Sequence, residues 1–168
     1  MNKKIFLIGL PGSGKTTLGK QLAVSLRLPF IDLDKAIENI AKKKVEDIFK
    51  ELGEPGFRKL EKETLHQHCQ QTESFVMATG GGAPCFGDNI EIMKKSGTVV
   101  FLDVAPKTIS ERIIHEVAHR PLLKHETPDS LKDRIEFLRS QRVSFYKQAH
   151  HTVNGSEITV AAMMAILS

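Results

Sequence analysis

Residues 9–16 read Gly-Leu-Pro-Gly-Ser-Gly-Lys-Thr and match the phosphate-loop pattern G-x-x-x-x-G-K-[ST] at every fixed position. An apolar run at 4–8 precedes them and predicts a buried strand; leucines at helical spacing predict a helix over 15–26. Glycines let successive N–H groups wrap a phosphate, Lys15 brings charge to the β- and γ-phosphates, and the Thr16 hydroxyl suits Mg²⁺. The stretch predicts a protein that binds a nucleoside triphosphate with magnesium.

Apolar runs and helical patterns alternate along the rest of the chain. Further strands are expected at 30–33, 75–78, 98–104 and 152–153, and further helices at 35–42, 45–52, 57–70, 89–95, 107–115, 130–149 and 157–167. The helix at 57–70 is polar and is expected on the surface, and 119–128 carries two prolines and is expected to be a loop. This alternation favours one α/β domain over residues 1–168, with a parallel sheet covered on both faces and the ligand at the carboxyl ends of the strands.

Composition excludes several classes of protein. Of the 168 residues 40% are hydrophobic and 26% charged, so the chain is not disordered. Its apolar runs are far shorter than the roughly 20 residues of a membrane span, and its start lacks a signal-peptide pattern, so we expect a cytoplasmic protein. A net charge of +4 permits nucleic acid as a partner but equally fits a site for phosphates or a carboxylate. Two cysteines make no disulfide framework.

The sequence contains neither Asp-x-x-Gly nor Asn-Lys-x-Asp, the motifs of switch GTPases, and it is short for a motor or helicase. A better guide is the pair Asp32 and Asp34. Strand alternation would put both carboxylates on one face at a strand's carboxyl end, where one serves magnesium and the other accepts a proton from a hydroxyl being phosphorylated. The competing interpretation is a strand end that leads into a capped helix. Asp103 also follows an apolar strand and is either a second acidic element or a strand cap.

Three other segments attract attention. Gly80, Gly81 and Gly82 follow a strand directly and allow a ligand to approach backbone N–H groups, although a flexible turn would look the same. Arg120 precedes a proline in the unassigned loop and could reach a transferring phosphoryl group, or lie on an ordinary surface loop. His66 and His68, followed by Cys69, resemble a metal cluster. On a helix, residues i and i+2 point to different faces and cannot easily share one ion, so a surface helix is favoured over a metal site.

Taken together, these motifs resemble those of shikimate kinases, and the likeness runs nearly end to end. The motifs that carry it are residues 9–17, Asp32-Leu33-Asp34, Gly56-Phe57-Arg58 with Glu61, residues 79–82, Arg120-Pro121-Leu122-Leu123, and Arg142 ahead of Phe145-Tyr146. The resemblance implies a P-loop NTPase fold in three layers, with five parallel strands in the order 2-3-1-4-5, helices on both faces and a mobile lid at about 116–127. It also implies ATP-dependent phosphorylation of the 3-hydroxyl of shikimate, in chorismate and aromatic amino-acid biosynthesis.

The resemblance also assigns roles to single residues. Lys15, Asp34 and Arg120 become the catalytic residues, with Asp34 also holding the shikimate hydroxyls. Arg58 and Arg142 grip the carboxylate, helped by backbone contacts from Gly80, Gly81 and Gly82. ATP is expected on Gly12, Ser13, Gly14, Lys15, Thr16, Thr17, Arg112 and Arg120, and Mg²⁺ on Thr16 and Asp32. Where the family has an adenine-stacking arginine, Ile113 stands here, so Arg112 is the nearest candidate. Ser144 stands where the family often has a proline.

Two rival functions stay open at this point. A kinase of the same type could use another acceptor, either a nucleoside monophosphate or a sugar acid such as gluconate. A non-catalytic nucleotide-binding or nucleic-acid-associated protein would lack the acceptor carboxylate and the arginines, and this sequence has both. We therefore expect a monomeric shikimate kinase, with shikimate and ATP as its partners and neither nucleic acid nor a membrane.

Overall fold

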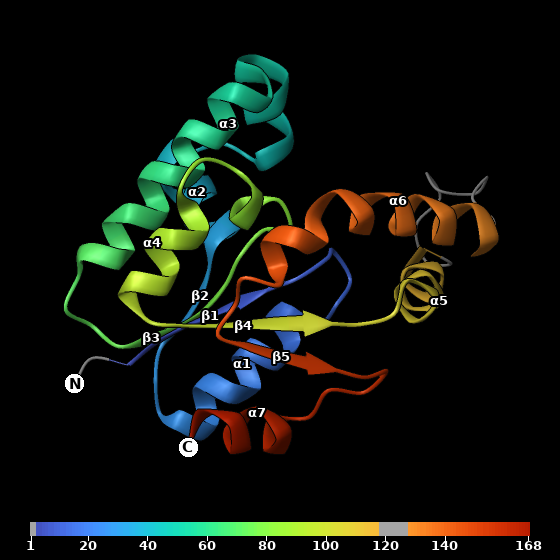
Figure 1. Ribbon diagram of the computed structural model, residues 1–168. Helices are drawn as coiled ribbons and strands as arrows, with labels where there is room; N and C mark the ends of the chain where they lie inside the picture. The colour runs from blue at the N-terminus through green and yellow to red at the C-terminus, as the bar shows by residue number, and fades with distance from the viewer. Residues whose placement is uncertain (1–2, 118–127) are drawn as a thin grey trace.

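The centre of the computed structural model, which describes residues 3–117 and 128–168, is a five-stranded parallel sheet (Figure 1). The strands are β1 (Lys4–Ile8), β2 (Phe30–Asp32), β3 (Phe75–Ala78), β4 (Thr98–Asp103) and β5 (His151–Asn154). They lie in the order β2-β3-β1-β4-β5, and every pairing is parallel. The α/β fold and the strand order expected from the sequence are thus confirmed.

Helices fill the connections between the strands. They are α1 (Lys15–Leu26), α2 (Leu33–Ala41), α3 (Val45–Gln70), the 3₁₀ turn η1 (Ala83–Cys85), α4 (Asn89–Ser96), α5 (Pro106–Val117), α6 (Pro128–Tyr146) and α7 (Val160–Leu167). The two helices expected within 45–70 form one span, which breaks at Gly53 because that residue has a φ of 64° and an extended ψ. The first two residues of the expected lid, 116 and 117, end α5. The remainder of the lid, with Arg120, lies outside the described residues.

The sheet has a hydrophobic core on each face because its central strands are apolar along most of their length, with polar residues only at strand ends. In β1, Phe6 and Ile8 pack with the side of α2, α3 and α4, whereas Ile5 and Leu7 pack with α1 and α7. Figure 1 shows α1 and α7 below the sheet and α3 and α4 above it. Covering both faces forces a ligand toward the ends of the strands.

The second half of α3 lies on the surface, as expected from its polarity, but one of its faces is buried. Phe57 and Leu65 are buried on the inner face of the helix, and so are the polar residues Glu61 and Thr64. The sequence pattern does not reveal this face, because glutamate and threonine are usually solvent-exposed. The burial of Glu61 brings a carboxylate toward the carboxyl ends of the strands.

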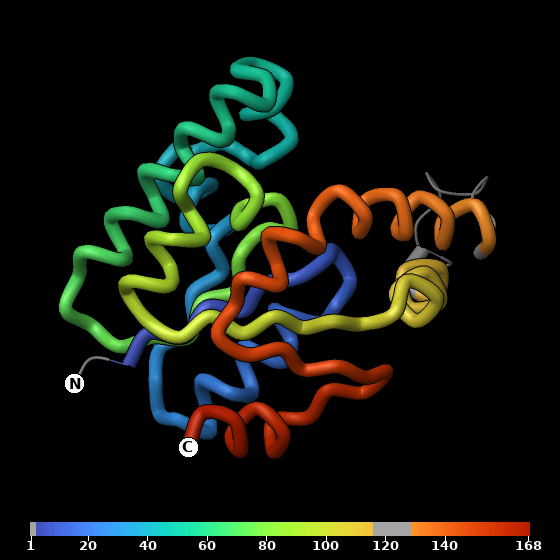
Figure 2. Tube along the Cα trace, viewed as in Figure 1, coloured from blue at the N-terminus to red at the C-terminus, as the bar shows by residue number. Residues whose placement is uncertain are grey.

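Strand register sets which loops meet. Asp32 of β2 and Leu7 of β1 are both paired with Ala78 of β3, so these three strands end side by side. The phosphate loop, the glycine run and the start of α2 all begin at that edge. Figure 2 shows the chain returning from α6 to the sheet, where β5 pairs with β4. Within the described residues, the helices are too short or too polar to cross a membrane.

Candidate active site

Lys15 begins α1, and the phosphate loop encloses its ammonium group. Its Nζ donates hydrogen bonds to the carbonyl oxygens of Gly9 at 2.9 Å and Leu10 at 2.8 Å, and the residue is 8% exposed. The loop turns this tightly because Gly12 and Gly14 have φ values of 79° and 92°, which other residues rarely adopt. A cation held at a helix N-terminus is the arrangement that binds phosphate groups.

The charge on Lys15 is sensitive to its surroundings. Burial lowers the pKa of Lys15 from 10.5 to about 8, the carboxylate of Asp34 opposes this shift, the charge of Arg142 adds to it, and Asp32 also opposes it. These interactions show that groups from β2, α2 and α6 surround the same ammonium group. A bound polyphosphate would favour the charged form, because an opposite charge nearby stabilises it.

Asp32 ends β2 and caps the next helix. Its Oδ1 accepts a hydrogen bond from the backbone N–H of Lys35 at 3.2 Å, and its Oδ2 accepts one from the Thr16 hydroxyl at 3.3 Å. Two hard oxygen donors of the kind that magnesium prefers thus lie side by side next to Lys15. Thr16 and Asp32, the pair expected to hold the metal, are brought together.

The strand alternation expected for Asp32 and Asp34 is wrong. The strand stops at Asp32 because its carboxylate caps α2, so Asp34 lies in the first turn of that helix rather than on a strand face. Asp34 still reaches the site. Burial and the charge of Asp32 raise its pKa, while Lys15 and Arg58 oppose the rise. A raised pKa makes a carboxylate a better proton acceptor.

Each glycine of the run 80–82 faces a different site residue. A Cβ atom at Gly80 would lie 3.1 Å from Asp34 Oδ1, and one at Gly81 would lie 2.8 Å from Pro11 Cδ and 3.1 Å from an Arg142 nitrogen. A Cβ atom at Gly82 would overlap the Arg58 guanidinium group. The run therefore brings the acceptor residues expected from the sequence into one place, where a side chain would crowd Asp34 and Arg142 and displace Arg58.

Glu61 is the acidic residue that our assignment of roles left out. Its Oε1 accepts a hydrogen bond from Arg58 Nη1 at 2.7 Å, and the residue is fully buried. Its Oε2 is also buried and finds no partner among the described residues. Burial raises the pKa of Glu61, and Arg58 opposes the rise. The useful signal in the sequence was the spacing i, i+3 from Arg58, which puts both side chains on one face of a helix.

Arg142 and Tyr146 come from the last two turns of α6. The Tyr146 hydroxyl donates a hydrogen bond to the carbonyl oxygen of Gly81 at 2.6 Å, and its ring packs against Phe101 of β4. Burial raises the pKa of Tyr146 to about 12, and Arg142 opposes the rise. This tyrosine, the only one in the chain, ties the end of α6 to the glycine run and so places Arg142 beside it.

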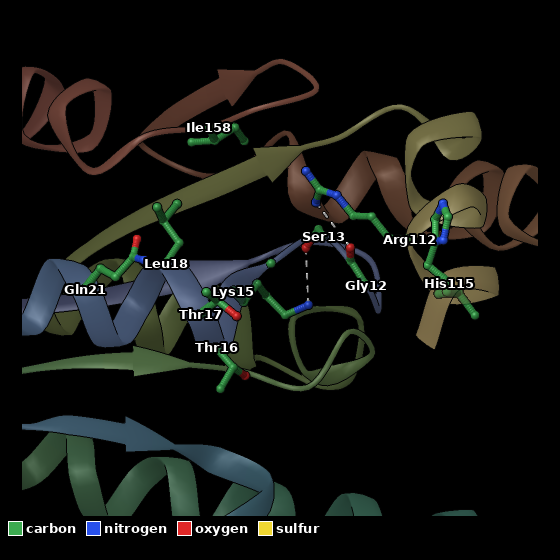
Figure 3. A pocket seen from close by; sticks show the side chains of 12 residues that line it. Gly12, Ser13, Lys15, Thr16, Thr17, Leu18, Gln21, Arg112, His115 and Ile158 are labelled. Carbon is green, nitrogen blue, oxygen red and sulfur yellow. Dashed lines mark hydrogen bonds between the residues drawn. The ribbon is translucent and has the colours of Figure 1, made fainter. Parts of the chain in front are cut away.

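A cavity of about 680 Å³ lies on the other side of the phosphate loop (Figure 3). Its lining residues come from the loop, α1, α5 and the segment before α7; they are Gly12, Ser13, Gly14, Lys15, Thr16, Thr17, Leu18, Gln21, Arg112, Ile113, His115 and Ile158. Arg112 reaches over the loop and donates hydrogen bonds to the carbonyl oxygens of Gly12 at 3.5 Å and of Ser156. All the residues expected to bind ATP line this cavity, except Arg120, which lies outside the described residues.

Asp103, the other acidic residue singled out in the sequence, pairs with an arginine of α6. Both carboxylate oxygens of Asp103 accept hydrogen bonds from one nitrogen of Arg139 at 3.0 Å, which fixes α6 to the end of β4.

The closely spaced His66, His68 and Cys69 lie on α3, where His68 hydrogen-bonds Gln71 at the end of the helix. Over residues 3–117 and 128–168, no group of three His, Cys, Asp or Glu side chains could hold a metal ion.

The comparisons with known proteins agree in family and fold. The sequence model of the shikimate kinase family matches residues 11–167. A shikimate kinase of Bacteroides fragilis is 49% identical over 148 residues, which cover 88% of this chain and 82% of that protein. The crystal structure of the Bacteroides thetaiotaomicron shikimate kinase superposes with a TM-score of 0.90 at 41% identity, over 98% of both chains. The Acinetobacter baumannii enzyme, solved with shikimate, gives 0.82 at 33% identity, over 99% of this chain and 90% of that one.

Proposed function

Because this chain belongs to the shikimate kinase family, we propose that it transfers the γ-phosphoryl group of ATP to the 3-hydroxyl of shikimate, giving shikimate 3-phosphate and ADP. The observation that carries this proposal is the glycine run, which lies against Asp34, Arg58 and Arg142 next to the phosphate loop. A carboxylate that accepts hydrogen bonds from hydroxyls, together with two guanidinium groups, suits a small polyhydroxy acid. The neighbouring cavity suits the nucleotide that phosphorylates it.

The nucleotide binds to the phosphate loop and the cavity beside it. Lys15 stabilises the charge on the γ-phosphate as the phosphoryl group leaves, and Arg112 forms the wall next to the base. Thr16 and Asp32 would hold Mg²⁺, since their oxygens lie 3.3 Å apart beside Lys15. The ion, when bound, supplies positive charge to the phosphate oxygens. Arg120, from its motif alone, stays our candidate for a further charge on the transferred group.

The acceptor binds on the glycine run. Arg58 and Arg142 hold its carboxylate, because a guanidinium group can donate two parallel hydrogen bonds to one carboxylate. Asp34 hydrogen-bonds the acceptor hydroxyls and accepts the proton of the one that attacks, a role for which its raised pKa suits it. Glu61, buried beneath the site, orients Arg58 by accepting a hydrogen bond from its Nη1. All these groups come from one chain, so we propose that the enzyme works as a monomer. We further propose that it acts in the cytoplasm, without nucleic acid or a membrane.

The test is ADP release in a coupled assay, with ATP, Mg²⁺ and one acceptor at a time. We expect turnover with shikimate and only background rates with gluconate or with nucleoside monophosphates. Faster turnover with either rival acceptor would overturn the proposed substrate. ADP release at one rate whether or not an acceptor is present would overturn the kinase assignment itself.

The carboxylate clamp makes a separate prediction. Arg142→Ala and Arg58→Ala should each weaken shikimate binding about 10- to 150-fold, because a hydrogen bond to a charged group contributes about 1.5–3 kcal/mol. ADP binding should change much less in both variants. Titration calorimetry measures the two affinities, and Lys132→Ala is the control, because Lys132 is a partly exposed residue of α6, the helix of Arg142, and pairs with Glu136. Equal losses for shikimate and ADP would contradict the clamp.

A further inference from the structure

An aromatic ring lies over the Arg58 guanidinium group. The Cζ atom of Arg58 is 4.0 Å from the centroid of the Phe86 ring and 5.2 Å from that of Phe57. The shorter distance is that of a cation stacked directly on a ring face. Phe86 comes from the loop after η1 and did not attract attention in the sequence, because it follows Pro84 in a stretch without periodicity.

The edge of the same guanidinium group is held by carboxylates. Glu61 accepts a hydrogen bond from Nη1 at 2.7 Å, and Glu54 accepts from Nε and Nη2 at 3.3 Å each. These bonds lie along the edge of the planar group, whereas Phe86 covers a face. The edge contacts alone leave the plane free to rock about them, and the ring restricts that motion.

The loop that carries Phe86 is itself fixed. Backbone N–H groups of Ala83 and Cys85 donate to the carbonyl oxygens of Gly80 at 3.1 Å and Gly82 at 2.9 Å. The buried side chain of Asn89 donates to the carbonyl oxygen of Ala83 at 2.9 Å. The glycine run and Phe86 thus belong to one braced segment, which meets Arg58 at both Gly82 and Phe86.

Phe86 is not placed there by the need to bury it. It is 37% exposed, whereas Phe6, Phe75 and Phe101 are each at most 1% exposed. An aromatic ring that stays partly in water while covering a guanidinium face keeps water off that face. Hydrogen bonds from a less hydrated cation to a carboxylate are stronger, because the local dielectric is lower.

We propose that Phe86 is a positioning residue for the acceptor: its ring holds the Arg58 guanidinium plane in the orientation that receives the acceptor's carboxylate. The proposal rests on the function proposed above and adds to it a determinant of acceptor affinity. Phe86 acts through Arg58, so its contribution depends on that side chain. Nucleotide binding, on the other side of the phosphate loop, does not depend on it.

The test is a double-mutant cycle on shikimate binding, measured by titration calorimetry. We expect Phe86→Leu to raise the Kd for shikimate about 2- to 30-fold, the range of a stacked cation, and to leave the Kd for ADP within about twofold. In the assay KM for shikimate should rise more than kcat falls. Phe86→Tyr should restore wild-type affinity, because a phenol ring stacks on a cation as well.

The second half of the cycle decides whether Phe86 acts through Arg58. With Arg58→Ala in place, adding Phe86→Leu should change shikimate affinity by less than about twofold. An equal loss in both backgrounds, a parallel loss of ADP affinity, or no loss with Phe86→Leu would each overturn the proposal. Turnover of shikimate by the wild-type enzyme tests the proposed function without any Phe86 variant. If the wild type turns over shikimate and the Phe86 variants give one of these contrary results, only the positioning role of Phe86 is overturned.

Discussion

Lys15→Ala should abolish phosphoryl transfer in a protein that still folds. We expect kcat with ATP and shikimate to fall about 10²- to 10³-fold or more, since removing a single preorganised donor from a site of developing negative charge has effects of that size. The coupled ADP-release assay measures the loss, and the circular dichroism spectrum checks the fold. A folded variant with near-normal turnover would contradict the role given to the phosphate loop.

Lys15→Met is the matched variant, because it keeps a long side chain in the buried position without its charge. In the wild type, the lowered pKa means that the folded protein binds fewer protons than the unfolded one between about pH 8 and 10.5. Wild-type stability relative to Lys15→Met should therefore rise over that window, whereas the cost of burying the charge is fully present below pH 8. ADP affinity should fall above pH 8 in the wild type only. Parallel pH profiles for both proteins would contradict a buried charged lysine.

The second large effect is expected at Asp34. Asp34→Asn keeps the shape of the side chain against Gly80 but removes the proton acceptor, so we expect kcat to fall about 10²- to 10⁴-fold. In the wild type, activity should be lost as the pH falls through the raised pKa of Asp34, where the carboxylate becomes protonated. Turnover under saturating shikimate, measured from pH 4.5 to 8, tests both statements.

Asp47→Asn is the control, because Asp47 is another first-turn carboxylate, at the exposed start of α3. It should leave kcat unchanged. If Asp34→Asn weakened shikimate binding and kept kcat, Asp34 would hold the acceptor hydroxyls without taking the proton. A variant with both parameters intact would place the acceptor elsewhere.

The parts of the fold that the sequence predicts well are decided by neighbouring residues. The bounds of β1 and α1 are as expected, because an apolar run, a glycine-rich turn and a helical repeat follow one another directly. Asp34 shows where such reasoning fails: a three-residue strand is too short for alternation to be tested, and a single capping carboxylate at Asp32 changes the following geometry from strand to helix.

The sequence predicts candidate site residues where a motif names their residue types, as at Arg58 and the glycine run, and the structure places these residues together. Glu61, Tyr146 and Phe86 were given no role for a physical reason. Each acts on a partner that depends on tertiary packing: Glu61 from the buried face of α3, Tyr146 across 65 positions of sequence, and Phe86 through a ring face that no polar pattern reveals.

The glycine run also limits how this enzyme can evolve. Because a Cβ atom would crowd Asp34 at position 80, the Pro11 ring at position 81 and Arg58 at position 82, a random library over residues 80–82 should return few active clones. A lineage selected for a different acceptor would have to keep these glycines and change the side chains around Arg58 instead. Laboratory selection for new acceptors is therefore better directed at α3 and at the segment after η1 than at the loop nearest the chemistry.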